Sequence, residues 1–284
     1  SGVAAGHARQ AGRPPVNGPQ LHRPRPPLSQ HIDFIGYWAH GGVTADRSRA
    51  LPRGAATVVI DVGGRDRVDF FSADGATRMP VEPSFLTGPG TLSYVTRIDP
   101  GEAVLTIHFR PGGALPFFGI PLADLENSCV NLTDLWGVAA TRLREQLIET
   151  PGWPRRIEIV EAFLLARLRP VSHTLMPVLH TAEHQPSLRV SEAAELTGLS
   201  PKRLIATFRN EIGLTPKAYL RVRRLQAALR LLDAGSGDGA GLAATLGYFD
   251  QPHFVREFRG FTSVTPTQYT QRRSALPSHV GLTG

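Results

Sequence analysis

Two stretches of sequence decide the fold of this chain: VSEAAELTGLSPKRLIATFRNEIG at 190–213 and GAGLAATLGYFDQPHFVREFRGF at 239–261. Each has a short apolar segment, a break at a glycine (Gly198 or Gly247), and a second, amphipathic segment that carries positive charge. A bracing helix followed by a helix that enters the DNA major groove has this layout. The sequence therefore predicts two helix–turn–helix units.

Capping signals predict where these helices begin. Ser191 and Ser200 are placed to cap the two helices of the first unit, Thr215 the helix that follows, and Asp250 the second helix of the second unit. The helix from Pro216 to about Asp233 spans roughly 27 Å at 1.5 Å per residue. A rigid spacer of this length suits two recognition helices about one DNA turn, roughly 34 Å, apart.

Positive charge lies outside the middle of the chain. The 284 residues have a net charge of +7; residues 31–169 carry 14 basic and 16 acidic residues, and residues 170–284 carry 13 basic and 8 acidic. A basic part beside a neutral one is expected of a nucleic-acid-binding module joined to another domain. A basic surface that only confers solubility has the same composition, so the charge supports the motifs without establishing them.

Cysteine usage and hydropathy exclude several classes of protein. The single cysteine, Cys129, cannot form an intrachain disulfide or a cysteine-based zinc site, and a reducing cytoplasmic setting fits best. No run of 18 apolar residues is present, so no membrane span is expected. Residues 1–27, rich in Pro, Gly and Arg, predict a disordered basic arm.

From His31 to about Gly119 the pattern is that of short strands. β-branched and aromatic runs alternate with turn signals, at 56–62, 67–71, 91–98 and 103–109. In the last run, Leu105 and Ile107 fall on one face and Thr106 and His108 on the other. These features predict an antiparallel sandwich or small barrel.

Two apolar stripes at helical spacing follow the strands. They lie at 132–147 and 157–168, and prolines at 151 and 170 end them. Two helices packed on the barrel would bury both stripes, and so would a dimer seam. The pattern leaves both arrangements open, with core packing the commoner one.

The C-terminal stretches resemble the AraC/XylS family of bacterial transcription regulators. The second unit carries the strongest signature, with Gly247-Tyr248, Asp250-Gln251, His253-Phe254 and Thr265-Pro266 at the family's positions. The first unit agrees through Leu199-Ser200-Pro201, Leu204, Phe208 and Thr215-Pro216. Ser263 departs from the pattern, because the family usually has glycine there.

Residues 28–150 resemble a sensor-type domain found before this module in many bacterial regulators, through FRPGGALPFFGIPLADLENSCVNLTDLWG at 109–137. The resemblance implies a cupin-like β-barrel followed by helices. The expected fold class is α+β with two domains. The expected order is an arm at 1–27, a cupin-like sensor or dimerisation domain at 28–170, an all-α double helix–turn–helix module at 171–275 and a tail at 276–284.

The residues expected to meet DNA lie on the exposed faces of the two recognition helices. Arginine can bond two acceptors on guanine and glutamine two groups on adenine, whereas small apolar side chains contact thymine methyls. The base-reading candidates are Lys202, Arg203, Ile205, Ala206, Gln251, Pro252, Val255 and Arg256. The phosphate-contact candidates are Arg209, Asn210, Arg221, Arg223, Arg224, His253 and Arg259; for any single arginine a phosphate contact is as plausible as a base contact.

The β-rich region is expected to hold a small effector and not to catalyse a reaction. Trp38, Arg53, His108 and Arg110 are the candidates for the pocket lining, and core packing is the plainer reading for Trp38. No metal site, cofactor or catalytic residue is expected, because the histidines at 31, 40 and 108 lack the close spacing of a catalytic cupin.

The sequence thus predicts a sequence-specific regulator that binds double-stranded promoter DNA in the bacterial cytoplasm. A small-molecule effector, RNA polymerase and a second copy of the chain are further partners that this reading leaves open. The alternative is a ligand-binding or protein-interaction protein whose helical module no longer binds DNA specifically, which the Ile205-Ala206 pair keeps open.

Overall fold

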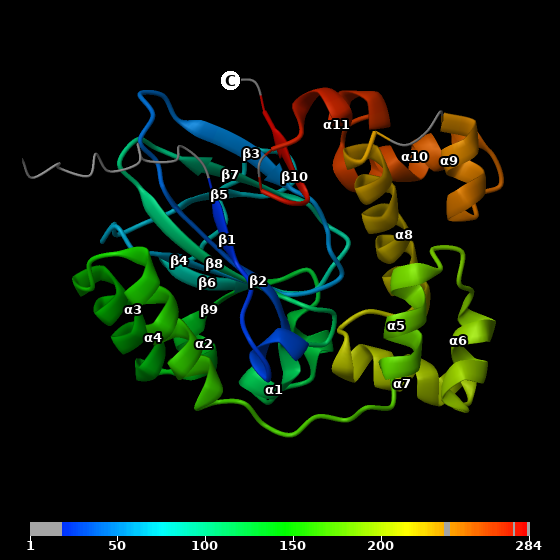
Figure 1. Ribbon diagram of the computed structural model, residues 1–284, viewed down its shortest axis with the longest axis horizontal. Coiled ribbons are helices and arrows are strands. Elements are labelled where there is room, and N and C mark those ends of the chain that lie inside the picture. Colours follow the sequence, from blue (N-terminus) through cyan, green and yellow to red (C-terminus); the bar gives the residue numbers. More distant parts are fainter. Residues whose placement is uncertain (1–18, 236–238, 275, 283–284) are drawn as a thin grey trace, which may run out of the picture.

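The computed structural model describes residues 19–235, 239–274 and 276–282. It has a β-rich N-terminal domain and a helical C-terminal module, which stand side by side (Figure 1). The expected α+β class with two domains is confirmed. The first 18 residues, most of the expected disordered arm, lie outside the described residues.

Within the described ranges, ten strands form two antiparallel sheets. The six-stranded sheet has the order β1-β2-β8-β4-β6-β9, and the four-stranded sheet has the order β10-β3-β7-β5. The strands are β1 (Gln20–His22), β2 (Ile32–Ala39), β3 (Asp46–Ala50), β4 (Thr57–Asp61), β5 (Asp69–Phe71), β6 (Ser84–Thr87), β7 (Tyr94–Ile98), β8 (Ala103–Phe109), β9 (Cys129–Asn131) and β10 (His279–Gly281).

The two sheets face each other without closing into a continuous barrel. One cavity between them is lined by residues of β2, β4 and β8 from the larger sheet and of β3 and β7 from the smaller one. No strand pairing joins the two sheets among the described residues. The domain expected to be a closed, cupin-like barrel is therefore an open sandwich around a cavity.

Strand β8 lies at the centre of the larger sheet and is buried on both faces. Leu105 and Ile107 pack into the main core with the helices outside the sheet, while Thr106 and His108 face the cavity. This is the alternation expected of the run 103–109. Each face of the strand has a further layer packed against it, which is why nearly all of its residues are buried.

Short helices cover the outer face of the larger sheet (Figure 1). The two apolar stripes are buried against that sheet, through Leu143 and Leu147 of one helix and Val160 and Leu164 of the next. Core packing therefore accounts for both stripes. The helices are α1 (Leu115–Phe118), α2 (Leu132–Trp136), α3 (Val138–Glu149) and α4 (Trp153–Leu165), with 3-10 turns η1 (Leu28–Gln30) and η2 (Leu122–Leu125).

In the part of the C-terminal module that the structure describes, seven helices are arranged around the longest of them, α8 (Figure 1). They are α5 (Met176–His184), α6 (Val190–Thr197), α7 (Pro201–Glu211), α8 (Pro216–Asp233), α9 (Gly239–Leu246), α10 (Gln251–Thr262) and α11 (Pro266–Arg272). Helix α8 contributes to two separate apolar cores. One core lies between α8 and helices α5–α7, and the other lies between α8 and helices α9–α11.

Both ends of the described chain differ from expectation. Gln20–His22, placed in the disordered arm, pairs with β2 as the edge strand of the larger sheet. His279–Gly281, placed in a tail, pairs with β3 as the edge strand of the smaller sheet. Both segments are three residues long, which is too short for a periodicity signal. The partner of β10, β3, is distant in sequence, and the partner of β1, β2, lies in a run that was not predicted as a strand.

Candidate nucleic-acid interface

The first helix–turn–helix unit consists of α6 and α7. Gly198 ends α6 in the left-handed conformation with φ of 66°, which glycine adopts without a steric penalty. The Ser200 side chain accepts a hydrogen bond from the backbone N–H of Arg203, so it caps α7 as expected. The Ser191 cap is wrong: α6 begins at Val190, two residues before the expected start at Glu192, and Arg189 is its N-cap residue. The Glu192 side chain accepts a hydrogen bond from the backbone N–H of Arg189.

Helix α7 divides cleanly into a buried and an exposed face. Leu204 and Phe208 are buried in the core of the unit. The opposite face exposes four of the base-reading candidates, at positions that share one side of a helix: Lys202, Arg203, Ile205 and Ala206. Ile205 is 45% exposed, so an apolar side chain lies on this face beside the cations.

The second unit consists of α9 and α10 and is built in the same way. Gly247 makes the turn with φ of 81°, and Asp250 caps α10 by accepting a hydrogen bond from the backbone N–H of His253. Phe254, Phe258 and Phe261 are buried, as the sequence pattern predicted. The outer face carries Gln251, Pro252, Arg256 and Arg259, which are exposed, while Val255 is half-buried.

The connecting helix has the predicted length. Thr215 caps it by accepting from the backbone N–H of Ala218, and the helix runs for 18 residues to Asp233. At 1.5 Å per residue this is roughly 27 Å. The two recognition helices are thus held at opposite ends of one rigid element (Figure 1).

Several phosphate-contact candidates have partners within the protein. Arg221 forms an ion pair of 2.6 Å with Glu257 and lies over the ring of Phe261. Arg209 lies 3.5 Å from Glu126 of the N-terminal domain. Asn210 and Arg259 are exposed.

Two further arginines of α8 face other parts of the protein. Arg224 donates to the backbone carbonyl of Pro186 and lies over the ring of Tyr248. Arg223 is half-buried, and its charge lowers the pKa of Arg53 in the N-terminal domain, after burial as the main cause. His253 is half-buried with its ring edge-on to Tyr248. These three side chains are built into the fold, whatever contact they make with DNA.

The pocket candidates fall into two cavities. Trp38, Arg53 and His108 line the cavity between the sheets, which has a volume of about 120 Å³. Arg110 lines a second cavity of about 340 Å³ between the two domains, beside His31, His173 and Tyr219. The sequence grouped these four residues only as aromatic or basic side chains beside strands, which does not reveal which side of the sheet each one faces.

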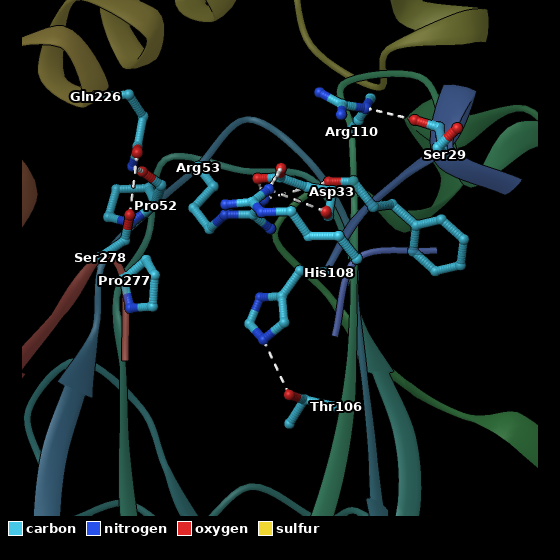
Figure 2. A network of polar contacts seen from close by, with 12 residues as sticks. Ser29, Asp33, Pro52, Arg53, Thr106, His108, Arg110, Gln226, Pro277 and Ser278 are labelled. Carbon is cyan, nitrogen blue, oxygen red and sulfur yellow. Dashed lines mark hydrogen bonds and ion pairs between the residues drawn. The ribbon is translucent and has the colours of Figure 1, made fainter. Parts of the chain in front are cut away.

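Two polar groups of the sandwich cavity, His108 and Arg53, are largely withdrawn from solvent. The His108 ring stacks on Phe34 and its Nε2 lies 2.9 Å from the Thr106 hydroxyl (Figure 2). Burial lowers the pKa of His108 well below its ordinary value, and the charge of Arg53 acts in the same direction. Burial also lowers the pKa of Arg53 to about 10, with Asp33 opposing the shift. His108 is therefore neutral at pH 7.

Four residues that line or adjoin this cavity were not predicted from the sequence. Pro52, Leu276 and His279 line it, and Gln226 of α8 donates a hydrogen bond to the Pro52 carbonyl, which joins the two domains (Figure 2). Only a contact between segments far apart in the chain brings them together. No local signal in the sequence marks them.

Among the described residues, one acidic group has the spacing of a metal site. Asp69, Asp99 and Glu102 lie close together, and each is paired with an arginine: Arg78, Arg97 and Arg65 respectively. These ion pairs account for the cluster without a cation. The histidines at 31, 40 and 108 do not meet in any such group within the described part of the chain. None of the helices described is both long and apolar enough to cross a membrane.

Two family models match the chain. Residues 193–272 match a helix-turn-helix domain, and residues 20–131 match a domain of unknown function, DUF6597. The second match begins at β1, so it includes the segment Gln20–His22 that was expected to belong to the disordered arm.

Curated relatives are similar over part of their length. An uncharacterized HTH-type transcriptional regulator of Haemophilus influenzae is 31% identical over 80 residues, which cover 28% of this chain and 27% of the relative. The arabinose operon regulatory protein of Escherichia coli is 24% identical over 124 residues, or 40% of this chain and 42% of the relative. The chain thus spans less than half the length of either relative.

Among solved structures, ToxT from Vibrio cholerae aligns over 84% of this chain and 97% of its own, with a TM-score of 0.44 and 10% identity. The family match at 193–272 coincides with both helix–turn–helix units, from α6 to α11. Residues 193–272 thus carry a helix-turn-helix domain similar to part of these regulators, and a domain of a functionally unassigned family precedes it at residues 20–131.

Proposed function

We propose that the chain is a sequence-specific, DNA-binding transcription regulator. The observation that carries the proposal is the pair of recognition helices, α7 and α10. Each buries one face in its own core and exposes the opposite face, and α8 holds them at its two ends. A DNA-reading surface requires such exposed faces at the spacing of successive major grooves.

The exposed side chains have the chemistry of a DNA-reading surface. Lys202, Arg203 and Arg256 make no side-chain hydrogen bond or ion pair within the described part of the chain. Free cations on one face attract phosphates and can reach base edges. Gln251 and the apolar Ile205 and Ala206 offer adenine and thymine contacts. The base-reading set remains our proposal.

The N-terminal domain is proposed to sense a small effector in the sandwich cavity. The cavity is lined mainly by apolar side chains, and Arg53 Nη1 and His108 Nδ1 are buried without a hydrogen-bond partner among the described residues. A ligand with a polar group directed at them would satisfy atoms that are costly to leave unpaired. We propose binding and not catalysis, as for relatives named as regulators.

A regulator of this kind acts on promoter DNA in the bacterial cytoplasm, and RNA polymerase and a second copy of the chain are its proposed protein partners. The alternative, a module that has lost DNA binding, is favoured only by the apolar Ile205-Ala206 pair on the reading face. Apolar side chains at such positions also read thymine methyls, so the first function has the better support.

The test is a fluorescence anisotropy titration of the purified protein against its own upstream DNA and a scrambled duplex, each at two salt concentrations. Specific binding predicts tight association with the upstream duplex, weaker association with the scrambled one, and affinity that falls as salt rises. Equal, weak binding to both duplexes would contradict sequence-specific recognition and favour the alternative.

A further inference from the structure

The segment after the last helix returns to the N-terminal domain. Strand β10 pairs antiparallel with β3, with His279 opposite Ala50, Val280 opposite Arg49 and Gly281 opposite Ser48. Figure 1 shows this strand beside β3, on the side of the N-terminal domain that faces α11. The side chains of His279 and Val280 are buried, that of Val280 completely. The DNA-binding module therefore contributes a strand to the sheet of the other domain.

The same segment supplies part of the cavity wall. Leu276 and His279 line the sandwich cavity together with Arg53 and His108. A Cβ placed on Gly36 of β2 would lie 3.6 Å from a Leu276 methyl, so this side chain reaches across to the opposite sheet. Any molecule that fills the cavity consequently touches residues that are continuous with the DNA-binding module.

A short chain of hydrogen bonds links this segment to α8. Gln226 of α8 donates to the Pro52 carbonyl at 2.8 Å and accepts from the Ser278 hydroxyl at 3.0 Å (Figure 2). The backbone N–H of Leu51 donates to the Ser278 carbonyl at 2.8 Å. Gln226 is buried, so both of its hydrogen bonds are shielded from water. One side chain of the spacer helix thus holds both the loop above the cavity and the returning segment.

Apolar packing follows the same route. Leu51 of the N-terminal domain and Val280 of β10 belong to the core that α8 shares with the second helix–turn–helix unit. A Cβ on Gly54 would lie 3.4 Å from Val222 of α8, so the loop approaches the helix closely. If β10 leaves β3, this core loses Val280, and Gln226 loses its bond to Ser278 at the same time.

We propose that residues 276–281 form a latch, a segment that holds the two domains together. When β10 leaves β3, the sandwich cavity opens and α8 is released from the N-terminal domain in the same event. The regulatory role of the latch rests on the proposed function, whereas the coupled opening rests on the contacts described above. A ligand that touches Leu276 and His279 binds the latched state better than the open state, and so favours it. The cavity volume of about 120 Å³ suits a compact, mainly apolar molecule with one hydrogen-bonding group.

A disulfide between β3 and β10 tests the latch directly. The bonds of Leu51 N–H to Ser278 and of Leu282 N–H to Arg47 make Ser48 and Gly281 a pair without mutual backbone hydrogen bonds. The Cα atoms of such a pair lie about 4.5 Å apart, within the range of a disulfide. The variant is Ser48→Cys with Gly281→Cys in a Cys129→Ser background, and its reduced form is the matched control. A Cβ on Gly281 meets only the Arg272 carbonyl, at 3.3 Å.

Hydrogen exchange gives the readout that needs neither ligand nor DNA. In the oxidised form we expect slower exchange in β3 and β10 and also, by at least about tenfold, in the part of α8 around Gln226, because all of them open together. Slowing confined to β3 and β10 would overturn the proposal. The single variant Ser48→Cys, treated with the same oxidant, shows whether oxidation itself alters exchange.

A second variant approaches the latch from α8. Gln226→Met keeps the size of the side chain and removes both hydrogen bonds. It is expected to speed exchange in β10 by about tenfold, although the substitution leaves the backbone pairing of β10 with β3 itself untouched. Unchanged exchange in β10 would show that the strand is held independently of α8, and would contradict the latch.

DNA binding distinguishes failure of the latch from failure of the proposed function. For the upstream duplex we expect the dissociation constants of the oxidised and reduced forms to differ at least about threefold, which is roughly 0.6 kcal/mol. Equal, measurable affinities would remove the regulatory role of the latch. If neither form binds DNA, the proposed function fails while the exchange experiment still decides whether the latch exists.

Discussion

Arg256 and Arg259 stand three residues apart on the exposed face of α10, yet we expect them to have different tasks. Arg256 lies nearer the helix N-terminus, the part of a recognition helix that contacts base edges. Arg259 lies in the last turn, where a phosphate contact is the expected one. Position along the helix, and not exposure, separates the two roles.

The Arg256→Ala variant should therefore lose discrimination at one base pair, by about 1–3 kcal/mol, and bind other sequences nearly as before. Arg259→Ala should weaken binding evenly across sequences. The measurement is a titration of both variants against a panel of single-base changes in the upstream site. An even loss over the whole panel for Arg256→Ala would remove its base-reading role.

His279 gives the stability of the protein a dependence on pH. Burial is the main cause that lowers its pKa to about 4, the hydrogen bond with the Pro277 carbonyl opposes the shift, and the Arg53 charge adds to it. Because the folded pKa lies below the ordinary value of 6.5, the unfolded chain binds more protons between pH 6.5 and pH 4. Stability contributed by neutral His279 is complete above pH 6.5 and declines as the pH falls.

Denaturant titrations at pH 7, 6 and 5 should show a loss on the order of 2 kcal/mol between pH 7 and pH 5 from this residue. In His279→Asn, whose amide can replace the Nδ1–H donor, the loss should be smaller. Part of the slope should remain, because burial also lowers the pKa of His108. Identical slopes in the two proteins would show that His279 does not titrate on unfolding.

At the scale of elements, the end of α10 carries a small strain. Ser263 occupies the C-cap in the left-handed conformation, with φ of 62°. The family usually has glycine here, and the left-handed conformation costs a residue with a Cβ about 1–2 kcal/mol. The serine is tolerated because the turn is also held by the Thr265 cap and by the buried Thr262 hydroxyl, which donates to the Phe258 carbonyl.

Ser263→Gly should stabilise the module by about 0.5–1 kcal/mol, since the gain in the folded state is partly offset by the freer unfolded chain. Ser263→Ala should be close to neutral, because alanine keeps the Cβ and no hydrogen bond of the serine side chain supports the turn among the described residues. The measurement is the melting temperature of the wild-type protein and of both variants at one pH. Equal melting temperatures would mean that the turn relaxes around serine without strain.

The elements that the sequence predicted are those with a strong local pattern. Residue spacing predicted the runs that form β4 and β8 and the length of α8. It also predicted the caps at Ser200, Thr215 and Asp250. Strand β2 was missed because Gly36 interrupts its pattern. A Cβ there would lie 2.7 Å from the Thr106 hydroxyl, so the Thr106 side chain occupies the space that a larger residue would need. Strand β10 depends on a partner near the other end of the chain, which periodicity cannot reveal.

For the molecule as a whole, the N-terminal domain contacts the C-terminal module at two places, beside the sandwich cavity and beside α7. Glu126, just after η2, lies 3.5 Å from Arg209 of α7. The backbone around Gly213, at the end of the first unit, approaches Pro89 and Leu122. The N-terminal domain therefore neutralises one phosphate-contact candidate while leaving the base-reading face of α7 exposed. In this arrangement one cation of α7 is held in an ion pair with the N-terminal domain.

This arrangement predicts that removing the carboxylate of Glu126 strengthens DNA binding. In Glu126→Gln, Arg209 is free to contact a phosphate, and the slope of log K against log salt should become steeper by about 0.9, the release expected for one added phosphate contact. The gain should be largest at low salt, where a half-exposed ion pair is least screened. Titrations over a series of salt concentrations measure both the slope and the affinity.

The matched controls separate this mechanism from a general change of charge. Arg209→Gln alone should hardly alter the slope, because Arg209 is already held by Glu126. The double variant Glu126→Gln with Arg209→Gln should lose the gain of the single one, since the freed cation is absent. A steeper slope that persists in the double variant would mean that Glu126 acts through the overall field of the N-terminal domain, and that docking of this domain does not withhold a specific cation from DNA.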